Sequence, residues 1–397
     1  MDQLAALPAN AIAADPILAL GALVLVAAVA GELAARWLRL PRITGYALTG
    51  MALGALGALP QPLTPGLRSA LDLCLGLVLF EVGARVDLGW LRRAPWMGAL
   101  AFAESAFTGA ALWALLHLAF GLAPSVAACG AALGISTSPA IALRAAAELS
   151  AQGQVTERML LLSATNSMAA VLILTAALPL LSGEPLASAA LRSVAVLVGS
   201  LALAVLVSAA GLGVLRLLGK RPEAQWVASV GLACVAVGGA SALGFSVALT
   251  LLSLGAGLRG MDRAQALLPL GIGRVAPLVT VLLFALASAS LDLRLALGVG
   301  ASALAFVAVR ALAKTAAVMV FAWPTRQPFA KAALLALALQ PMSGLAAILV
   351  HDADGAALAL AGSVAPIALA AVAVLELAGP LLVQLALRLA GEAKPEA

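Results

Sequence analysis

The chain has 397 residues, of which 63% are hydrophobic and only 10% are charged, whereas an average soluble domain carries about 25% charged residues. The formal net charge of +5 comes from basic residues that are spread over short loops without forming one patch, so we expect no nucleic-acid partner. Together these figures exclude an ordinary soluble domain and predict an all-α protein that crosses a lipid bilayer.

Apolar runs that are long enough to cross a bilayer recur along the whole sequence. A helical span needs about 20 apolar residues, and only helices and closed barrels satisfy their backbone groups in lipid. The runs lack the alternation of barrel strands, so we expect about thirteen transmembrane helices. Their expected bounds are 16–36, 43–60, 70–90, 95–118, 123–149, 158–182, 191–218, 224–240, 243–261, 273–290, 294–322, 329–350 and 357–387.

Basic residues favour one side of these spans. Pairs such as Arg92 and Arg93 fill the loops of one side, whereas only Arg68, Arg192 and Arg294 lie in the loops of the other side. Short loops rich in Lys and Arg stay in the cytoplasm. We therefore expect an integral protein of the bacterial inner membrane, with its N-terminus outside and a short tail, 391–397, in the cytoplasm.

Two of the expected helices are interrupted by proline in a polar setting. The run Ser136–Pro139 falls inside 123–149, and Gln340–Gly344 falls inside 329–350. Paired interruptions in corresponding helices of two halves are typical of transporters with inverted repeats. We expect one transmembrane domain over 1–390, with a first repeat at about 16–182, a linker helix at 191–218 and a second repeat at about 224–387. Two ordinary proline kinks are the simpler interpretation.

Charged residues also lie well inside the expected spans, where each costs at least about 2.5–3.5 kcal/mol. They are Glu81, Glu104, Arg310, Lys314 and Glu376. Counted from the helix ends, Glu104 and Lys314 reach a similar depth, so we expect Lys314 to pair with a carboxylate. Structural ion pairs are an equally simple expectation for Glu81 and Glu376.

Five segments, in order, resemble one family of transporters. Leu40–Tyr46, Leu79–Gly83, Ser136–Pro139, Arg310–Lys314 and Glu376–Pro380 are similar to signature segments of the Kef-type, sodium/hydrogen exchanger-like cation:proton antiporters. That family has the NhaA-type fold, and the resemblance covers nearly the whole chain.

The resemblance implies a homodimer in which a scaffold of helices holds a moving core. The scaffold would comprise the first three expected spans and those at 224–240, 243–261 and 273–290, and the core would comprise the three spans within 95–182 and the last three spans. In this family a cation and protons compete for carboxylates on the span that corresponds to 158–182. The usual Asp pair, Asn-Asp or Gln-Asp is replaced here by Asn166 and Ser167.

The hypothesis that follows is secondary transport of a monovalent cation, Na⁺ or K⁺, in exchange for protons. The residues expected at the site are Ser136, Thr137, Ser138, Asn166, Ser167, Glu104, Arg310, Lys314, Gln340 and Ser343. Glu104 is the best-placed proton carrier, because the span 158–182 offers no titrating group near Asn166. We expect no cofactor, and no metal other than the transported cation.

Other interpretations stay open. Hydroxyl and amide groups beside Arg310 and Lys314 suit an organic anion as cargo, and an ion-paired site suits a homologue that no longer transports. A membrane enzyme would need a base beside Ser136 or Ser138. The two histidines, His117 and His351, fall near the ends of expected helices, and no Gly-x-Ser-x-Gly segment is present. We therefore do not expect an enzyme.

Overall fold

The computed structural model describes residues 16–59, 63–85, 94–181, 185–262, 275–291, 298–342 and 364–394, and these ranges contain helices and turns but no strand. The α-helices are α2 (Pro16–Leu38), α3 (Arg42–Ala55), α4 (Pro65–Gly83), α6 (Pro95–Ala114), α7 (Pro124–Ile135), α8 (Pro139–Glu148), α9 (Gln154–Ala177), α10 (Leu186–Leu218), α11 (Pro222–Leu243), α12 (Val247–Met261), α13 (Ala276–Ala289), α15 (Gly300–Val320), α16 (Phe329–Ala338) and α19 (Val364–Leu389). A π-helical turn, η1 (Leu115–Ala119), extends α6, and a 3-10 turn, η2 (Leu178–Leu181), extends α9.

Within the described ranges, eight helical segments are long and apolar enough to cross a membrane. Large apolar side chains lie on their outer surfaces, and Ile17 and Leu217 are 83% and 87% exposed. Water would oppose such exposure, whereas lipid chains accept it. The long apolar helices and their apolar outer faces together describe an all-helical membrane fold.

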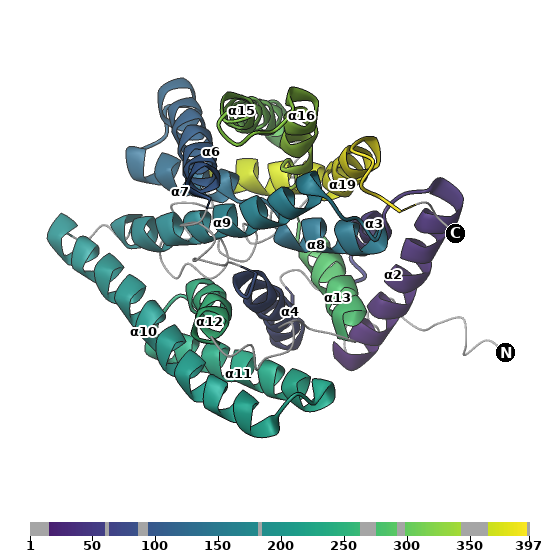
Figure 1. The fold of residues 1–397 in the computed structure, drawn as a ribbon, viewed down its shortest axis with the longest axis vertical. Coiled ribbons are helices and arrows are strands. Elements are labelled where there is room, and N and C mark those ends of the chain that lie inside the picture. Colours follow the sequence, from purple (N-terminus) through teal and green to yellow (C-terminus); the bar gives the residue numbers. More distant parts are fainter. Residues whose placement is uncertain are drawn as a thin grey trace.

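The helices form two groups that meet along a boundary, which we call the seam (Figure 1). The first group contains α2, α3, α4, α10, α11, α12 and α13, and its closest packing pairs are α3 with α13 and α10 with α12. The second group contains α6, α7, α8, α9, α15, α16 and α19, in which α15 packs on α6 and α16 packs on α19. At the seam, α8 contacts α4, and α19 contacts α3.

Glycines allow helices of the first group to approach backbone to backbone. A Cβ atom at Gly83 of α4 would lie 2.0 Å from the Leu252 carbonyl oxygen of α12, and one at Gly255 would lie 2.2 Å from the Phe80 carbonyl oxygen. Neither position has room for a larger residue. Small residues at such crossings are the usual means of packing helices in lipid.

The C-terminal segment ties α19 to the start of α9. The Glu392 carboxylate accepts hydrogen bonds from the backbone N–H of Val155 (3.0 Å) and of Thr156 (2.8 Å) and from the Thr156 hydroxyl (2.9 Å). It also pairs with Lys331 of α16 at 3.5 Å. An anion at a helix N-terminus satisfies free N–H groups and meets the positive end of the helix dipole. Glu392 therefore fastens three helices of the second group together.

This contact predicts a pH-dependent contribution to stability. Burial raises the pKa of Glu392, but the hydrogen bonds from Val155 and Thr156 and the nearby Lys331 ammonium outweigh burial and hold the pKa below its ordinary value. The stabilisation is therefore present above the unfolded-state pKa of about 4.3 and is lost as the pH falls through the lower folded-state value. We expect Glu392→Gln to lower the free energy of unfolding by about 1–2 kcal/mol at neutral pH.

Thermal unfolding of the detergent-purified protein over a series of pH values measures this effect. The difference between the unmodified protein and Glu392→Gln should shrink as the solution is acidified. Glu157→Gln, an exposed change in the first turn of the same helix, is the matched control and should have little effect. A difference that does not depend on pH would contradict the role given to the Glu392 charge.

Candidate functional site

The centre of the second group is a crossing of two helix ends. The helix α7 ends at Ile135 and α8 begins at Pro139, so the three residues between them are not helical. The helix α16 ends at Ala338, and Gln340–Met342 follow without helical structure. The two irregular segments touch, because the Ser138 N–H donates to the Pro341 carbonyl oxygen at 2.9 Å. Ser343, the last of the expected site residues, lies outside the described residues.

Arg310 of α15 is fully buried beneath this crossing. Its guanidinium donates to the carbonyl oxygens of Gly134 (2.7 Å), Ser136 (2.7 Å), Gln340 (2.6 Å) and Pro341 (3.4 Å). The last carbonyls of a helix lack partners within that helix and form its negative end. Arg310 thus supplies donors and positive charge to the C-terminal ends of α7 and α16 together.

Lys314, one turn further along α15, forms an ion pair with Glu104 of α6, and both side chains are 0% exposed. The expectation that Lys314 pairs with a deeply placed carboxylate is therefore confirmed. The Lys314 ammonium also donates to the Ile135 carbonyl oxygen (3.0 Å) and to the Thr137 hydroxyl (3.1 Å). Among the described residues, one oxygen of Glu104, Oε2, is buried without a hydrogen-bond partner, and so is the hydroxyl of Thr108, one helical turn away.

A chain of polar side chains connects this ion pair to α9. The Thr137 hydroxyl accepts a hydrogen bond from the Asn166 side-chain amide at 3.2 Å, and the Asn166 side-chain oxygen, Oδ1, accepts one from Ser105 at 3.2 Å. Ser167 donates to the Thr137 carbonyl oxygen at 2.9 Å. Ser105 was missed by the sequence analysis, because a lone serine in a helix rich in small residues has no distinguishing pattern; only its place next to Glu104 pointed to it.

The side chains of three other expected site residues bond to the backbone and not to the ion pair. The Ser136 hydroxyl donates back to the Leu133 carbonyl oxygen of α7, and the Gln340 amide donates back to the Ala336 carbonyl oxygen of α16. Ser138 caps α8 by accepting a hydrogen bond from the Ile141 N–H. These three residues shape the two irregular segments, while Glu104, Lys314 and Asn166 hold the polar centre.

The two carboxylates for which structural ion pairs were expected differ. Glu81 of α4 does form such pairs, with Arg144 of α8 at 3.1 Å and Arg85 at 3.5 Å. Glu376 forms no ion pair with any residue that the structure describes. Its fully buried carboxylate accepts one hydrogen bond, from the Ser288 hydroxyl at 2.7 Å. The reason is that the facing helix α13 is free of charged residues.

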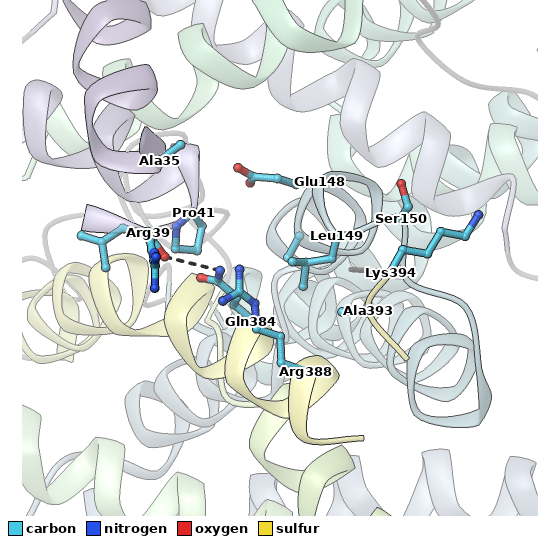
Figure 2. Close-up of a pocket in the computed structure, with 12 residues that line it drawn as sticks. Ala35, Arg39, Pro41, Glu148, Leu149, Ser150, Gln384, Arg388, Ala393 and Lys394 are labelled. Carbon is cyan, nitrogen blue, oxygen red and sulfur yellow. Dashed lines mark hydrogen bonds between the residues drawn. The ribbon is translucent and has the colours of Figure 1, made fainter. Parts of the chain in front are cut away.

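A cleft of about 620 Å³ opens at one end of the seam (Figure 2). Arg39 and Pro41, between α2 and α3, line one side, and Glu148 of α8 with Gln384 and Arg388 of α19 line the other. Figure 2 shows Arg388 close to Gln384, whose amide donates to the Arg39 carbonyl oxygen at 3.4 Å. The cleft thus lies between the two helix groups, and polar side chains line its α19 side.

Comparisons with known proteins agree with this architecture. The family model described as "Sodium/hydrogen exchanger, transmembrane" matches residues 22–388. A structure of the sodium proton antiporter MjNhaP1 from Methanocaldococcus jannaschii at pH 8 is similar, with a TM-score of 0.70, 16% sequence identity, and coverage of 94% of this chain and 95% of that one. A second structure of MjNhaP1, from an electron-microscopy map, has a TM-score of 0.67, 17% identity, and coverage of 96% and 100%. No curated protein matches the chain. At these identities the structural likeness establishes a common fold.

Proposed function

Because the chain belongs to the sodium/hydrogen exchanger family, a family of membrane transporters that exchange cations for protons, we propose that it exchanges Na⁺ or K⁺ for protons at the crossing of α7, α8 and α16. The observation that supports placing the proposed exchange at this crossing is the buried ion pair between Glu104 and Lys314. It is the pair of opposite charges on which two helix ends and α9 converge.

Competition for Glu104 would couple the two fluxes. A cation that binds the Glu104 carboxylate must displace the Lys314 ammonium from it, and an unpaired buried ammonium is unstable as a charged group. Lys314 then releases its proton when the cation enters, and takes a proton up when the cation leaves. Because the two groups are tightly coupled, the exchanged proton belongs to the pair, not to either residue alone.

Oxygen ligands for a dehydrated cation are available on α6. Among the described residues, Glu104 Oε2 and the Thr108 hydroxyl are buried without hydrogen-bond partners, and Ser105, next to Glu104, donates to the Asn166 side-chain oxygen. Hard cations such as Na⁺ and K⁺ favour oxygen ligands, and buried oxygens without hydrogen bonds are costly to a protein unless a ligand uses them. We therefore assign the cation to the Glu104 carboxylate, with the Thr108 hydroxyl as a further ligand, in place of the Lys314 ammonium.

The organic-anion alternative has little support from the charges. The Arg310 guanidinium is occupied by carbonyl oxygens, and the Lys314 ammonium is occupied by Glu104. Neither cation is free to bind an anion. An inactive, ion-paired homologue is the alternative that the transport experiment below addresses.

The same proposal covers assembly and orientation. The first helix group without α10 would serve as the scaffold of a homodimer, and the second group would serve as the moving core, with α10 as the linker between inverted repeats at about 16–182 and 224–387. Arg158, near the start of α9, donates to the Gln327 side chain and to the Thr325 carbonyl oxygen. The start of α9 and the loop before α16 therefore lie at the same end of the molecule. Arg42, at the start of α3, pairs with Glu148, at the end of α8, so these two helix ends also lie together. Lys- and Arg-rich loops predict that this end is cytoplasmic.

Reconstitution into liposomes that contain a pH-sensitive dye tests the proposed exchange. Gradients of Na⁺, K⁺ and Li⁺ are imposed separately, and the direction of the proton flux is recorded. We expect at least one of these gradients to drive protons in the opposite direction to the cation. If none of the cations moves protons, the proposal fails and the inactive-homologue interpretation takes its place.

A further inference from the structure

Glu376 has no role in the exchange described above, yet it lies in a place where a carboxyl group is costly. It is 1% exposed near the middle of α19, and Ser288 of α13 provides its hydrogen bond. Because α13 belongs to the first helix group and α19 to the second, this bond crosses the seam. Any sliding of one group past the other would break it.

The surroundings of Glu376 do not suit an ionised carboxylate. The cavity beside it, of about 20 Å³, is lined by apolar side chains of α4 and α13, including Val78, Leu283 and Phe284, and by Ser138. This volume holds about one water molecule, which is too little for a hydrated cation. A carboxylate with one neutral hydrogen-bond donor in such a cavity has lost most of its solvation, and neutralisation by a proton is the usual remedy.

Neighbouring charges do not provide a counter-ion. The helices around this cavity or packed on α19 are α3, α4, α7, α8, α13, α15 and α16, and α7 and α13 carry no charged residue. The charged residues of the other five have partners of their own: Arg42 with Glu148, Glu81 with Arg144, Arg310 with carbonyl oxygens, Lys314 with Glu104, and Lys331 with Glu392, and Arg68 and Asp72 are also engaged in interactions. Glu376 thus faces the seam without an ion pair in the described part of the chain.

One face of α19 leads from this carboxyl group to the cleft. Glu376, Pro380, Gln384 and Arg388 follow one another at intervals of four residues, so they form a row that winds slowly around the helix. Gln384 and Arg388 line the cleft in Figure 2, and Gln384 lies about 12 Å along the axis from Glu376. Pro380 has no N–H, so the Glu376 carbonyl oxygen has no helical partner and is a further acceptor on this face.

We propose that Glu376 is a second proton-binding site, separate from the Glu104–Lys314 pair. With the seam closed, Glu376 holds a proton and bonds to Ser288. When α19 moves away from α13 and its face opens to the cleft, the carboxyl group meets water and releases that proton. The proton-binding step follows from the closed geometry alone, whereas its use in transport rests on the exchange proposed above.

Infrared spectroscopy of the purified, reconstituted protein tests the protonation directly, without reference to transport. The unmodified protein at neutral pH should show the carbonyl stretching band of a protonated carboxylic acid. This band should be absent in Glu376→Gln and should move in frequency in Ser288→Ala, which loses the hydrogen bond. Glu104→Gln should retain it. A spectrum in which Glu376→Gln leaves the band unchanged, or an unmodified protein without the band, would overturn the proposal.

Transport assays address the use of this proton. Glutamine imitates the protonated acid in shape but cannot release a proton, so cation-driven proton flux in Glu376→Gln should fall by about tenfold or more. Ser288→Ala, which leaves the acid in place, should keep most of the flux with a shifted pH dependence. Unchanged flux and pH dependence in Glu376→Gln would remove Glu376 from the transport cycle, whatever Glu104→Gln does.

Discussion

Replacing Glu104 with glutamine is expected to abolish cation-driven proton flux, with a loss of at least about a hundredfold. The amide keeps the shape of the side chain but has no charge for which a cation and the Lys314 ammonium could compete. The described part of α9 offers no substitute near Asn166, because its one acidic residue, Glu157, lies in the first turn. The measurement is proton flux in proteoliposomes, expressed per correctly folded molecule.

Two further variants separate lost transport from lost folding. Breaking one partner of a buried ion pair costs about 3–5 kcal/mol, so Glu104→Gln alone is expected to be less stable. The double variant Glu104→Gln/Lys314→Met removes both charges and should recover stability while staying inactive. Glu81→Gln changes a carboxylate in a different ion pair, with Arg144, and should keep coupled flux. Flux that persists with its pH dependence in Glu104→Gln would show that the proton travels elsewhere.

Replacing Arg310 with methionine is expected to lower the free energy of unfolding by about 3–5 kcal/mol. Four carbonyl oxygens at the ends of α7 and α16 accept hydrogen bonds from this side chain, and the residues that carry them are buried. Methionine fills much of the volume but donates nothing, so the carbonyls lose their partners and the helix ends lose the cation that opposes their dipoles.

The matched variants for Arg310 are Arg310→Lys and Arg158→Met. Lysine restores the charge but lacks the planar fork that reaches several carbonyls at once, so its loss should be intermediate. Arg158 bonds to one carbonyl oxygen and one side chain at the edge of the protein, and its removal should cost about 1–2 kcal/mol. Unfolding in detergent, followed by tryptophan fluorescence, gives the comparison. An Arg310→Met protein as stable as Arg158→Met would contradict the role given to the buried guanidinium.

Apolar length and charge made much of this architecture predictable. The all-helical membrane fold and membership of the sodium/hydrogen exchangers are confirmed, because a bilayer restricts a chain to long apolar helices and because several weak motifs occur in order. The pairing of Lys314 was also predictable, since counting residues from a helix end fixes the depth of a charge. The Kef-type subgroup, the inverted repeats and the dimer stay predictions.

Partners across helices were harder to predict, because depth does not say which way a side chain points. Arg310 shares a helix face with Lys314, yet it binds carbonyl oxygens while Lys314 takes the carboxylate. Glu376 was expected in an ion pair and instead meets Ser288, because the rotation of α19 relative to α13 is set by packing that a single sequence does not reveal. The same limit concealed Ser105.

Proton release on cation binding tests the central claim most directly. Detergent-solubilised protein in weakly buffered solution with a pH indicator is mixed with Na⁺ or K⁺, and the protons released are counted against an equal addition of choline. The Glu104–Lys314 competition predicts rapid proton release by the unmodified protein with at least one of the two cations, and no release by Glu104→Gln. Cation binding without proton release, or equal release from both proteins, would contradict the claim that this buried pair couples the two ions.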